Sequence, residues 1–262
     1  MIPPQKMLEE IARTIEEFTK TKYSSLPRLV VGRLEEYITL IKNTSNNSSG
    51  QDKKPSELTA NQIKNLMKEY DSFDAQYISE KNDKIFLKKK LPDFPDEAGY
   101  AIGHELVHKY QQDIGFDKKT ADNIYRDYAM RTDCEYSANF IIYALMEGHA
   151  EFITINSLLK SDNYKEEARN NLVLMEKSFA RILPKAEKAY KKIQTLYDEA
   201  EPSSLIHSLD TFKVRDILNS LGKGAEYTTG YYYFRKNAKE GKDINNLLLK
   251  PTATLKELLV PE

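Results

Sequence analysis

Cysteine is nearly absent from this chain of 262 residues, and neither sign of charge is in excess. The single cysteine, Cys134, excludes a disulfide within the chain and favours a reducing compartment. Lysine and arginine together number 39 and aspartate and glutamate 40, so no overall field attracts nucleic acid or an anionic membrane. We therefore expect neither a nucleic acid nor a membrane as a partner.

Long apolar runs are missing too. A membrane-spanning helix needs about 20 consecutive apolar residues, and no run in the sequence approaches that length. Residues 1–6 (MIPPQK) lack the basic and then apolar order of a signal peptide. These features predict a cytoplasmic protein if residue 1 is the native start, and they leave the oligomeric state open.

Amphipathic helices are expected to form most of the chain, because the apolar residues, 40% of the sequence, recur mainly at helical spacing. The segments predicted to be helical lie behind Pro3-Pro4, behind Pro27, and over 56–70, 133–159 and 164–200. Pro184 should kink or divide the last of these helices. Residues 43–55 (NTSNNSSGQDKKP) are polar and aperiodic, which predicts a linker or mobile loop.

One segment departs from this helical pattern. Residues 76–78 and 84–87 are apolar stretches on either side of the turn-like Lys81-Asn82-Asp83, an arrangement typical of a short β-hairpin. The predicted fold class is therefore α+β and mainly helical. We divide the chain into an N-terminal helical segment with its mobile loop, 1–55, and a main domain, 56–262, on which the N-terminal helices pack.

The most specific motif is HExxH, formed by His104-Glu105-Leu106-Val107-His108. Histidines four apart lie on the same face of a helix, so both imidazoles can reach one metal ion. The glutamate after the first histidine can take a proton from a water molecule on that metal. We expect a helix over this motif, with Asp96 as its N-cap. The alternative is two histidines that share a helix face by coincidence.

A third metal ligand must come from elsewhere, because a catalytic zinc site usually has three protein ligands. Glu147 is the candidate, since Gly148 and Ala150 are small enough to let its helix approach the first one closely. Glu151 is one turn later and could accept a hydrogen bond from a ligand histidine, whereas His149 should point away from the metal. For both glutamates the alternative is a solvated carboxylate on a helix surface.

HELVH followed by EGHAEF resembles the gluzincins, zinc metallopeptidases with two histidines from HExxH and a glutamate from a second helix. Further parts of the resemblance are the hairpin ahead of the motif, the QQD sequence after it, a YTTG segment at 227–230 and the tail over 251–262. The resemblance covers residues 75–262. It implies a metzincin- or thermolysin-like zincin core, with the hairpin preceding the active-site helix.

This resemblance implies a zinc metallopeptidase, a hydrolase that acts on a peptide or protein with Zn²⁺ as its cofactor. His104, His108 and Glu147 would bind the metal, and Glu105 would be the general base. The family binds its substrate as an extended strand, here along the hairpin edge at 84–87. An aminopeptidase is not supported, because the GxMEN-type motif is absent; an endopeptidase is expected.

The donor that stabilises the oxyanion is not fixed by the motif. Tyr227, Tyr231 and His207 are candidates, because each follows the metal helices and carries a suitable proton. Two other functions stay open. One is a degenerate peptidase fold that binds a peptide or protein, and the other is a latent peptidase restrained by its N-terminal helices.

Overall fold

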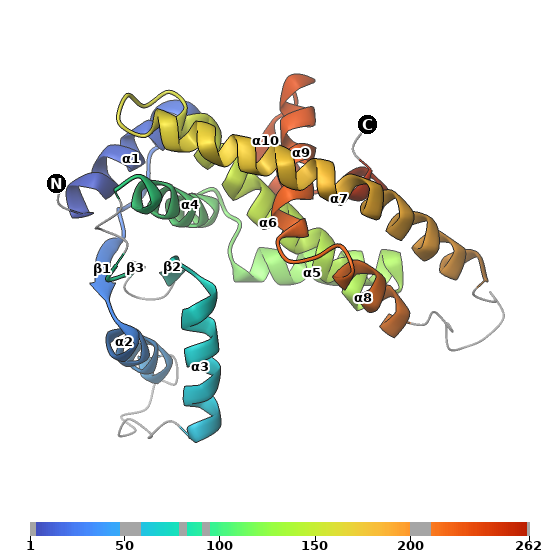
Figure 1. Ribbon diagram of the computed structural model, residues 1–262, viewed down its shortest axis with the longest axis horizontal. Helices are drawn as coiled ribbons and strands as arrows, with labels where there is room; N and C mark the ends of the chain where they lie inside the picture. Colours follow the sequence, from blue (N-terminus) through green and yellow to red (C-terminus); the bar gives the residue numbers. More distant parts are fainter. Residues whose placement is uncertain (1–3, 48–58, 79–82, 91–94, 200–210, 261–262) are drawn as a thin grey trace. The chain divides into compact units, whose positions relative to one another are not determined.

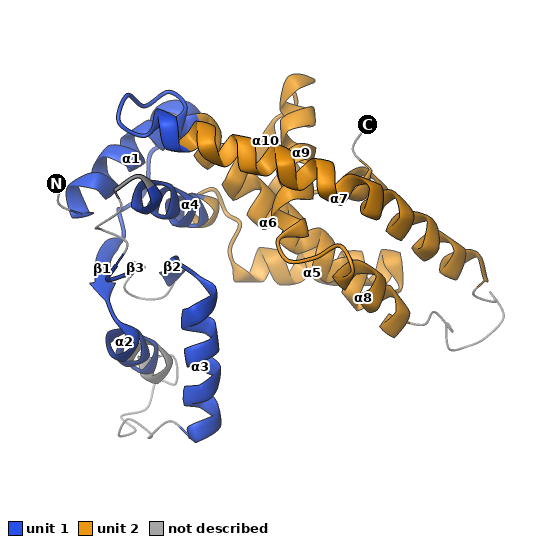
Figure 2. Ribbon diagram, viewed as in Figure 1, with its two compact units in different colours: residues 1–110, 157–167 blue, residues 111–156, 168–262 orange. Residues whose placement is uncertain are grey.

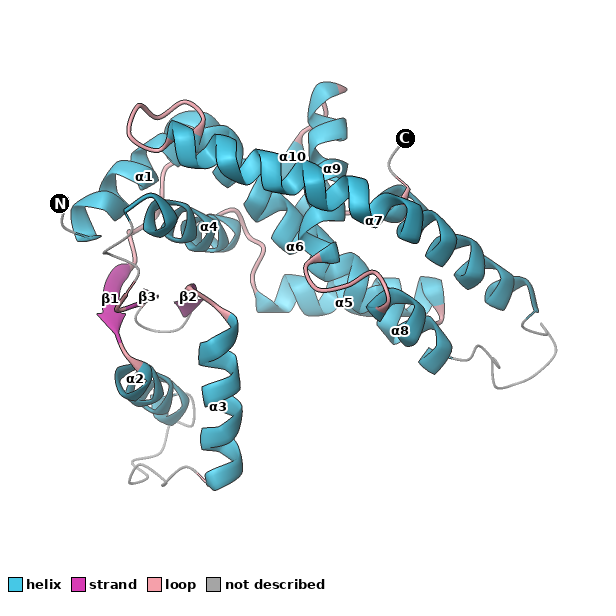
Figure 3. Ribbon diagram, viewed as in Figure 1, coloured by secondary structure: helices cyan, strands magenta, loops and turns pink. Residues whose placement is uncertain are grey.

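The computed structural model describes residues 4–47, 59–78, 83–90, 95–199 and 211–260. Helices account for most of these residues, and a single three-stranded sheet accounts for the strands among them (Figures 1 and 3). The predicted class, α+β and mainly helical, is therefore confirmed. Within the described ranges, no helix is both long and apolar enough to cross a membrane.

The chain divides into two compact units (Figure 2). Unit 1 comprises residues 1–110 and 157–167, and unit 2 comprises residues 111–156 and 168–262. Three helices contribute residues to both units: α4 (Pro95–Asp113), α6 (Glu135–Leu158) and α7 (Lys165–Glu199).

Unit 1 is built around the sheet. Its helices are α1 (Pro4–Thr19), α2 (Leu34–Asn47), α3 (Ala60–Ser72) and most of α4 (Pro95–Asp113), and its strands are β1 (Arg28–Gly32), β2 (Ala75–Ile78) and β3 (Lys84–Lys88). The strand order is β1-β3-β2, with β3 parallel to β1 and antiparallel to β2. The predicted hairpin is confirmed as β2 and β3.

Strand β3 is buried on both faces, which is why its sequence is a continuous apolar run. On one face, Phe86 packs against Tyr37 and Leu40 of α2 and against partly buried side chains of α3. Because side chains alternate along a strand, Ile85 and Leu87 point to the opposite face, where both are fully buried. Figure 1 shows α2 and α3 on one side of the sheet.

Three sequence expectations for unit 1 are wrong. Residues 28–32 form a strand and not the start of a helix, because they pair with β3, 56 positions along the chain (Arg28↔Lys84). Strand β3 is paired on both sides, so the hairpin edge at 84–87 is not open to a peptide; the sheet edges are β1 and β2. Residues 43–47 belong to α2, whereas 48–55 of the expected loop lie outside the described residues.

The helix starts are close to those expected. Helix α1, the helix expected behind Pro3-Pro4, buries Met7, Leu8, Ile11 and Ile15 on one face. Helix α3 begins at Ala60 with Thr59 and Gln62 in a capping box, a few residues after the expected start. Helix α4 begins at Pro95, a residue suited to the first helical position, so Asp96 lies inside the first turn and not at the cap.

All regular secondary structure among the described residues of unit 2 is helical. Its helices are α5 (Lys118–Thr132), α6 (Glu135–Leu158), α7 (Lys165–Glu199), α8 (Thr211–Asn219), α9 (Ala225–Lys239), α10 (Ile244–Leu249) and α11 (Leu255–Leu259), with the ends of α4, α6 and α7 shared as stated. The helices predicted over 133–159 and 164–200 are confirmed as α6 and α7. Pro184 does not divide α7, which is one continuous helix.

Helices α6 and α9 approach each other through two glycines. A Cβ atom on Gly148 would lie 2.2 Å from the carbonyl carbon of Gly230, and one on Gly230 would lie 1.8 Å from the carbonyl oxygen of Ala144. Neither position has room for a side chain. The expected role of Gly148, an approach between α6 and the HExxH helix, stays a prediction; the contact that the structure gives for Gly148 is the one with α9.

Candidate metal centre

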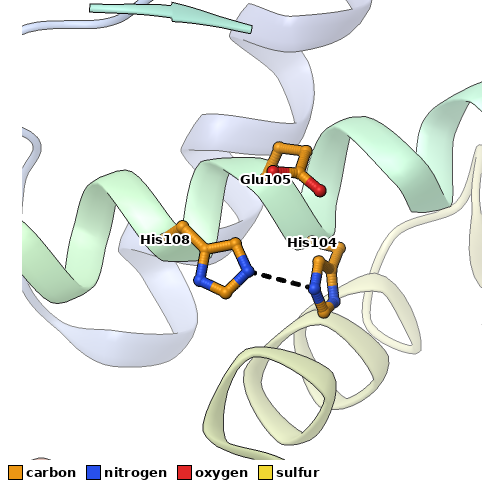
Figure 4. Close-up of side chains that lie close together, drawn as sticks. All are labelled: His104, Glu105 and His108. Carbon is orange, nitrogen blue, oxygen red and sulfur yellow. Dashed lines mark hydrogen bonds between the residues drawn. The ribbon is translucent and has the colours of Figure 1, made fainter. Parts of the chain in front are cut away.

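The HExxH residues lie on α4, in unit 1, and the two histidine rings are turned toward each other (Figure 4). Their Nε2 atoms are 3.2 Å apart, and the rings are nearly perpendicular, at 84°. His104 is buried, while Glu105 and His108 are half-buried. Among the described residues, these three form the one group of His, Cys, Asp or Glu side chains that could hold a metal ion, with ligand atoms within 4.8 Å of one another.

The distance between the two nitrogens suits a shared metal ion. Two imidazoles bound to tetrahedral zinc, with Zn–N bonds of about 2.05 Å, have their nitrogens about 3.3 Å apart. The observed separation of 3.2 Å is close to this value. The same distance also suits a hydrogen bond between two neutral imidazoles, in which one Nε2 carries the proton. Two imidazoles and a neighbouring carboxylate are a donor set that zinc accepts.

The Glu105 carboxylate is held by the edge of the sheet. It accepts a hydrogen bond of 2.5 Å from the main-chain N–H of Tyr77 in β2. Lys88 donates its N–H to the carbonyl of Asp74, so alternate pairs along β2 and β3 are hydrogen-bonded, and the pair of Tyr77 with Ile85 is not. The Tyr77 N–H therefore points away from β3, toward Glu105.

One turn further along α4, Lys109 makes a second connection to the same strand. Its side chain is 6% exposed, and its Nζ lies 3.3 Å from Asp83 Oδ2 and 3.1 Å from Ser24 Oγ. The other oxygen of Asp83 accepts a hydrogen bond of 2.8 Å from the Tyr77 hydroxyl. Tyr77 is thus linked to α4 through both its main chain and its side chain.

Lys109 and Asp83 are the site residues that the sequence analysis missed. The available signal was a lysine one turn after Glu105, on the same helix face, between apolar residues. Val107, two residues before it, and Tyr110, the next residue, are fully buried. A lysine in such a place requires a buried partner, but the sequence does not say which acidic residue supplies it.

Glu147 and Glu151 lie on α6 within unit 2, outside the group formed by the HExxH residues. They are 8% and 7% exposed, so neither is the solvated helix carboxylate considered as an alternative. A buried carboxylate is costly unless it is hydrogen-bonded or bound to a cation. Their predicted roles as third ligand and hydrogen-bond acceptor remain predictions.

His149 is a fully buried residue whose two ring nitrogens both have partners within unit 2. Nδ1 lies 3.3 Å from Gln111 Nε2, and Nε2 lies 3.2 Å from Asn245 Oδ1. The ring packs edge-on against Phe234. Gln111 also donates a hydrogen bond of 2.8 Å to the carbonyl of Met146. His149 is therefore a core histidine in a buried polar network.

The candidates for the oxyanion donor differ in accessibility. Tyr227, on α9, is 38% exposed, whereas Tyr231, on the same helix, is buried against Phe152 and Tyr232. Burial raises the pKa of Tyr231 to about 12. Tyr231 is thus part of the unit 2 core, and His207 lies outside the described residues.

Comparisons with known proteins found no relative of this chain. No protein-family model matches the chain, and neither a curated protein nor a solved structure matches it significantly.

Proposed function

We propose that this chain is a zinc-dependent peptidase of the gluzincin type, and that it cleaves within peptide chains. His104 and His108 would be two metal ligands, Glu147 the third, and Glu105 the general base. The observation that carries the proposal is the pair of Nε2 atoms 3.2 Å apart on a helix face that also presents a carboxylate. The zincin core is part of this proposal.

Each residue of the motif has a defined task in this reaction. Bound zinc would supply a Lewis acid that makes water a stronger nucleophile at neutral pH. Glu105 would accept the proton of the attacking water and deliver it to the leaving amine. Its carboxylate is oriented by the N–H of Tyr77, which restricts the directions from which it can receive that proton.

Support for Glu147 as third ligand comes from its burial within unit 2. The residue is 8% exposed, and a buried carboxylate is costly unless it is hydrogen-bonded or bound to a cation.

An extended peptide is the proposed substrate, and β2 is the strand it would pair with. This replaces the edge at 84–87, which β1 and β2 occupy. The outward main-chain groups of β2 belong to Ala75 and Tyr77; since the Tyr77 N–H is bonded to the Glu105 carboxylate, a peptide would pair with the other outward groups. A peptide added at this edge would therefore lie beside the general base.

Elemental analysis of the purified protein after zinc loading tests the metal site. We expect one zinc per chain in the wild type and in Glu105→Gln, and little zinc in Glu147→Gln. Glu167→Gln is the matched control, because Glu167 is equally buried and accepts a hydrogen bond from the Tyr100 N–H, which glutamine can preserve. This control should keep its zinc.

Cleavage of casein and of a mixed peptide library then tests the chemistry. The wild type should cleave, and Glu105→Gln, although loaded with zinc, should lose at least about 100-fold in kcat. A wild type that binds zinc but cleaves neither substrate would favour the peptide-binding module. A wild type that binds no zinc at all would refute the proposal.

A further inference from the structure

A chain of part-buried polar contacts joins β2 to α4 at two points in unit 1. One point is the hydrogen bond between the Tyr77 N–H and the Glu105 carboxylate. The other is the link from Lys109 through Asp83 to the Tyr77 hydroxyl. Glu105 and Lys109 are four residues apart, so they lie on one face of α4, about 6 Å apart along its axis.

This double attachment restricts Tyr77 more than either contact alone. Pairing with β3 holds one edge of β2 and leaves the other edge, which carries the Tyr77 N–H, to be positioned against α4 by these contacts. The second contact holds the far end of the Tyr77 side chain, because the ring is rigid and its hydroxyl is fixed by Asp83. The direction of the Tyr77 N–H, and with it the orientation of the Glu105 carboxylate, is therefore set.

Lys109 and Asp83 form a charged pair at this contact. The Lys109 side chain is almost fully buried and that of Asp83 is partly buried, and an ion pair removed from water is seldom more stabilising than apolar side chains of similar size. Such pairs can instead specify one geometry. In this case the geometry specified is that of the strand residue that contacts the general base.

We propose that Lys109 and Asp83 are positioning residues, which act through Tyr77 to orient the Glu105 carboxylate beside the sheet edge. Neither residue belongs to the HExxH motif. The inference rests on the proposed function only in taking Glu105 as the base; the positioning itself can be measured without metal or substrate.

The first measurement is hydrogen exchange of single amides by NMR in the metal-free protein. The wild-type Tyr77 amide should be protected. Tyr77→Phe, which removes only the hydroxyl, and Lys109→Met should each speed exchange at position 77 by roughly tenfold or more. The Phe86 amide, in the central strand, should be unaffected, which would show that the sheet is intact.

Lys88→Met is the matched control. Lys88 is also a lysine at this hairpin and also pairs with an aspartate, Asp74, at 3.9 Å, but its contacts include neither Asp83 nor Tyr77. This variant should leave exchange at position 77 unchanged. If Tyr77→Phe and Lys109→Met also leave it unchanged, the positioning role is overturned. Should Lys109→Met fail to fold, the milder Tyr77→Phe decides.

The second measurement is peptide cleavage per bound zinc. Tyr77→Phe and Lys109→Met should lower kcat by roughly 10- to 100-fold, with KM and zinc content close to wild type. A purely structural role would reduce the amount of folded, zinc-loaded protein but not kcat per zinc. If kcat per zinc is unchanged, the inference is refuted. If the wild type has no activity but exchange at position 77 behaves as expected, the peptidase proposal fails and the positioning stands.

Discussion

The histidines of the described chain occupy two kinds of environment. His104 and His108 face each other across 3.2 Å, a separation that fits a shared metal ion as well as a hydrogen bond between neutral imidazoles. His149 instead has a protein partner on each ring nitrogen and is fully buried. The first pair is therefore suited to binding a ligand, and the third histidine to holding the core of unit 2.

Matched histidine variants should separate these roles. His108→Leu should abolish zinc binding and change stability little, because His108 is only half-buried. His149→Leu should keep its zinc but lower the free energy of unfolding by about 1–3 kcal/mol, because Gln111 and Asn245 lose a buried partner. Urea unfolding and elemental analysis of both proteins measure the difference. Zinc loss in His149→Leu would contradict this assignment.

Buried tyrosines should make the protein sensitive to alkali. Burial raises the pKa of Tyr164, Tyr231 and Tyr233 to about 12, above the ordinary value of 10.0. The unfolded chain loses these protons at a lower pH than the folded chain does. The contribution of these tyrosines to the free energy of unfolding is therefore fully present below pH 10 and is lost as the pH rises toward 12. Tyrosinate absorbance should show these tyrosines ionising only as the protein unfolds. In Tyr231→Phe the alkaline midpoint should move upward.

Contacts between residues close together in the sequence could be predicted, and contacts between distant residues could not. His104, Glu105 and His108 could be grouped from the sequence because the helix period alone brings them together. The link from Lys109 to Asp83 could not, because it joins residues 26 positions apart through a strand and a helix whose packing the sequence does not state. The partners of His149 could not be predicted either, because Gln111 and Asn245 are also far from it in the sequence.

At the scale of elements, the confirmed predictions are those with a long periodic pattern. Helices α1, α6 and α7 and the hairpin were predicted from patterns within a single segment. Strand β1 was not predicted, because the apolar residues among its five positions continue the helical spacing of those in α2. The two segments together therefore predicted one helix. What makes 28–32 a strand is its pairing with β3, a parallel contact across more than 50 residues.

The close contact between α6 and α9 depends on two glycines, so a larger residue at either position should destabilise the fold strongly. Gly230→Ala would place a methyl group 1.8 Å from the Ala144 carbonyl oxygen, so the two helices must move apart. We expect a loss of about 3 kcal/mol or more in the free energy of unfolding.

Gly241→Ala is the control for this variant. Gly241 has a positive φ of 76° but open space around its Cβ position, so alanine there should cost only about 1 kcal/mol. Urea unfolding of both variants compares the two costs. Equal losses would show that α6 and α9 can separate without penalty.

At the scale of the whole molecule, the two sequence motifs fall on helices that contribute to both units. Helix α4 carries HExxH, and α6 carries Glu147 and Glu151. The burial of both glutamates and the paired histidines are observations on separate units, and the proposed ligand set combines them. A property of the entire folded chain, its stability with and without zinc, is therefore the most direct check on that combination.

Zinc should stabilise the folded chain in proportion to the logarithm of its concentration, by about 4 kcal/mol at 1,000 times Kd. In thermal unfolding, Glu147→Gln should lose most of the zinc-dependent rise in Tm. Glu151→Gln should keep part of it, since a residue that orients a ligand typically changes metal affinity by about 10- to 100-fold. Glu167→Gln should retain the full rise. If Glu147→Gln responds to zinc as the wild type does, the third ligand is another residue, and the histidine pair would have to be completed from elsewhere in the chain.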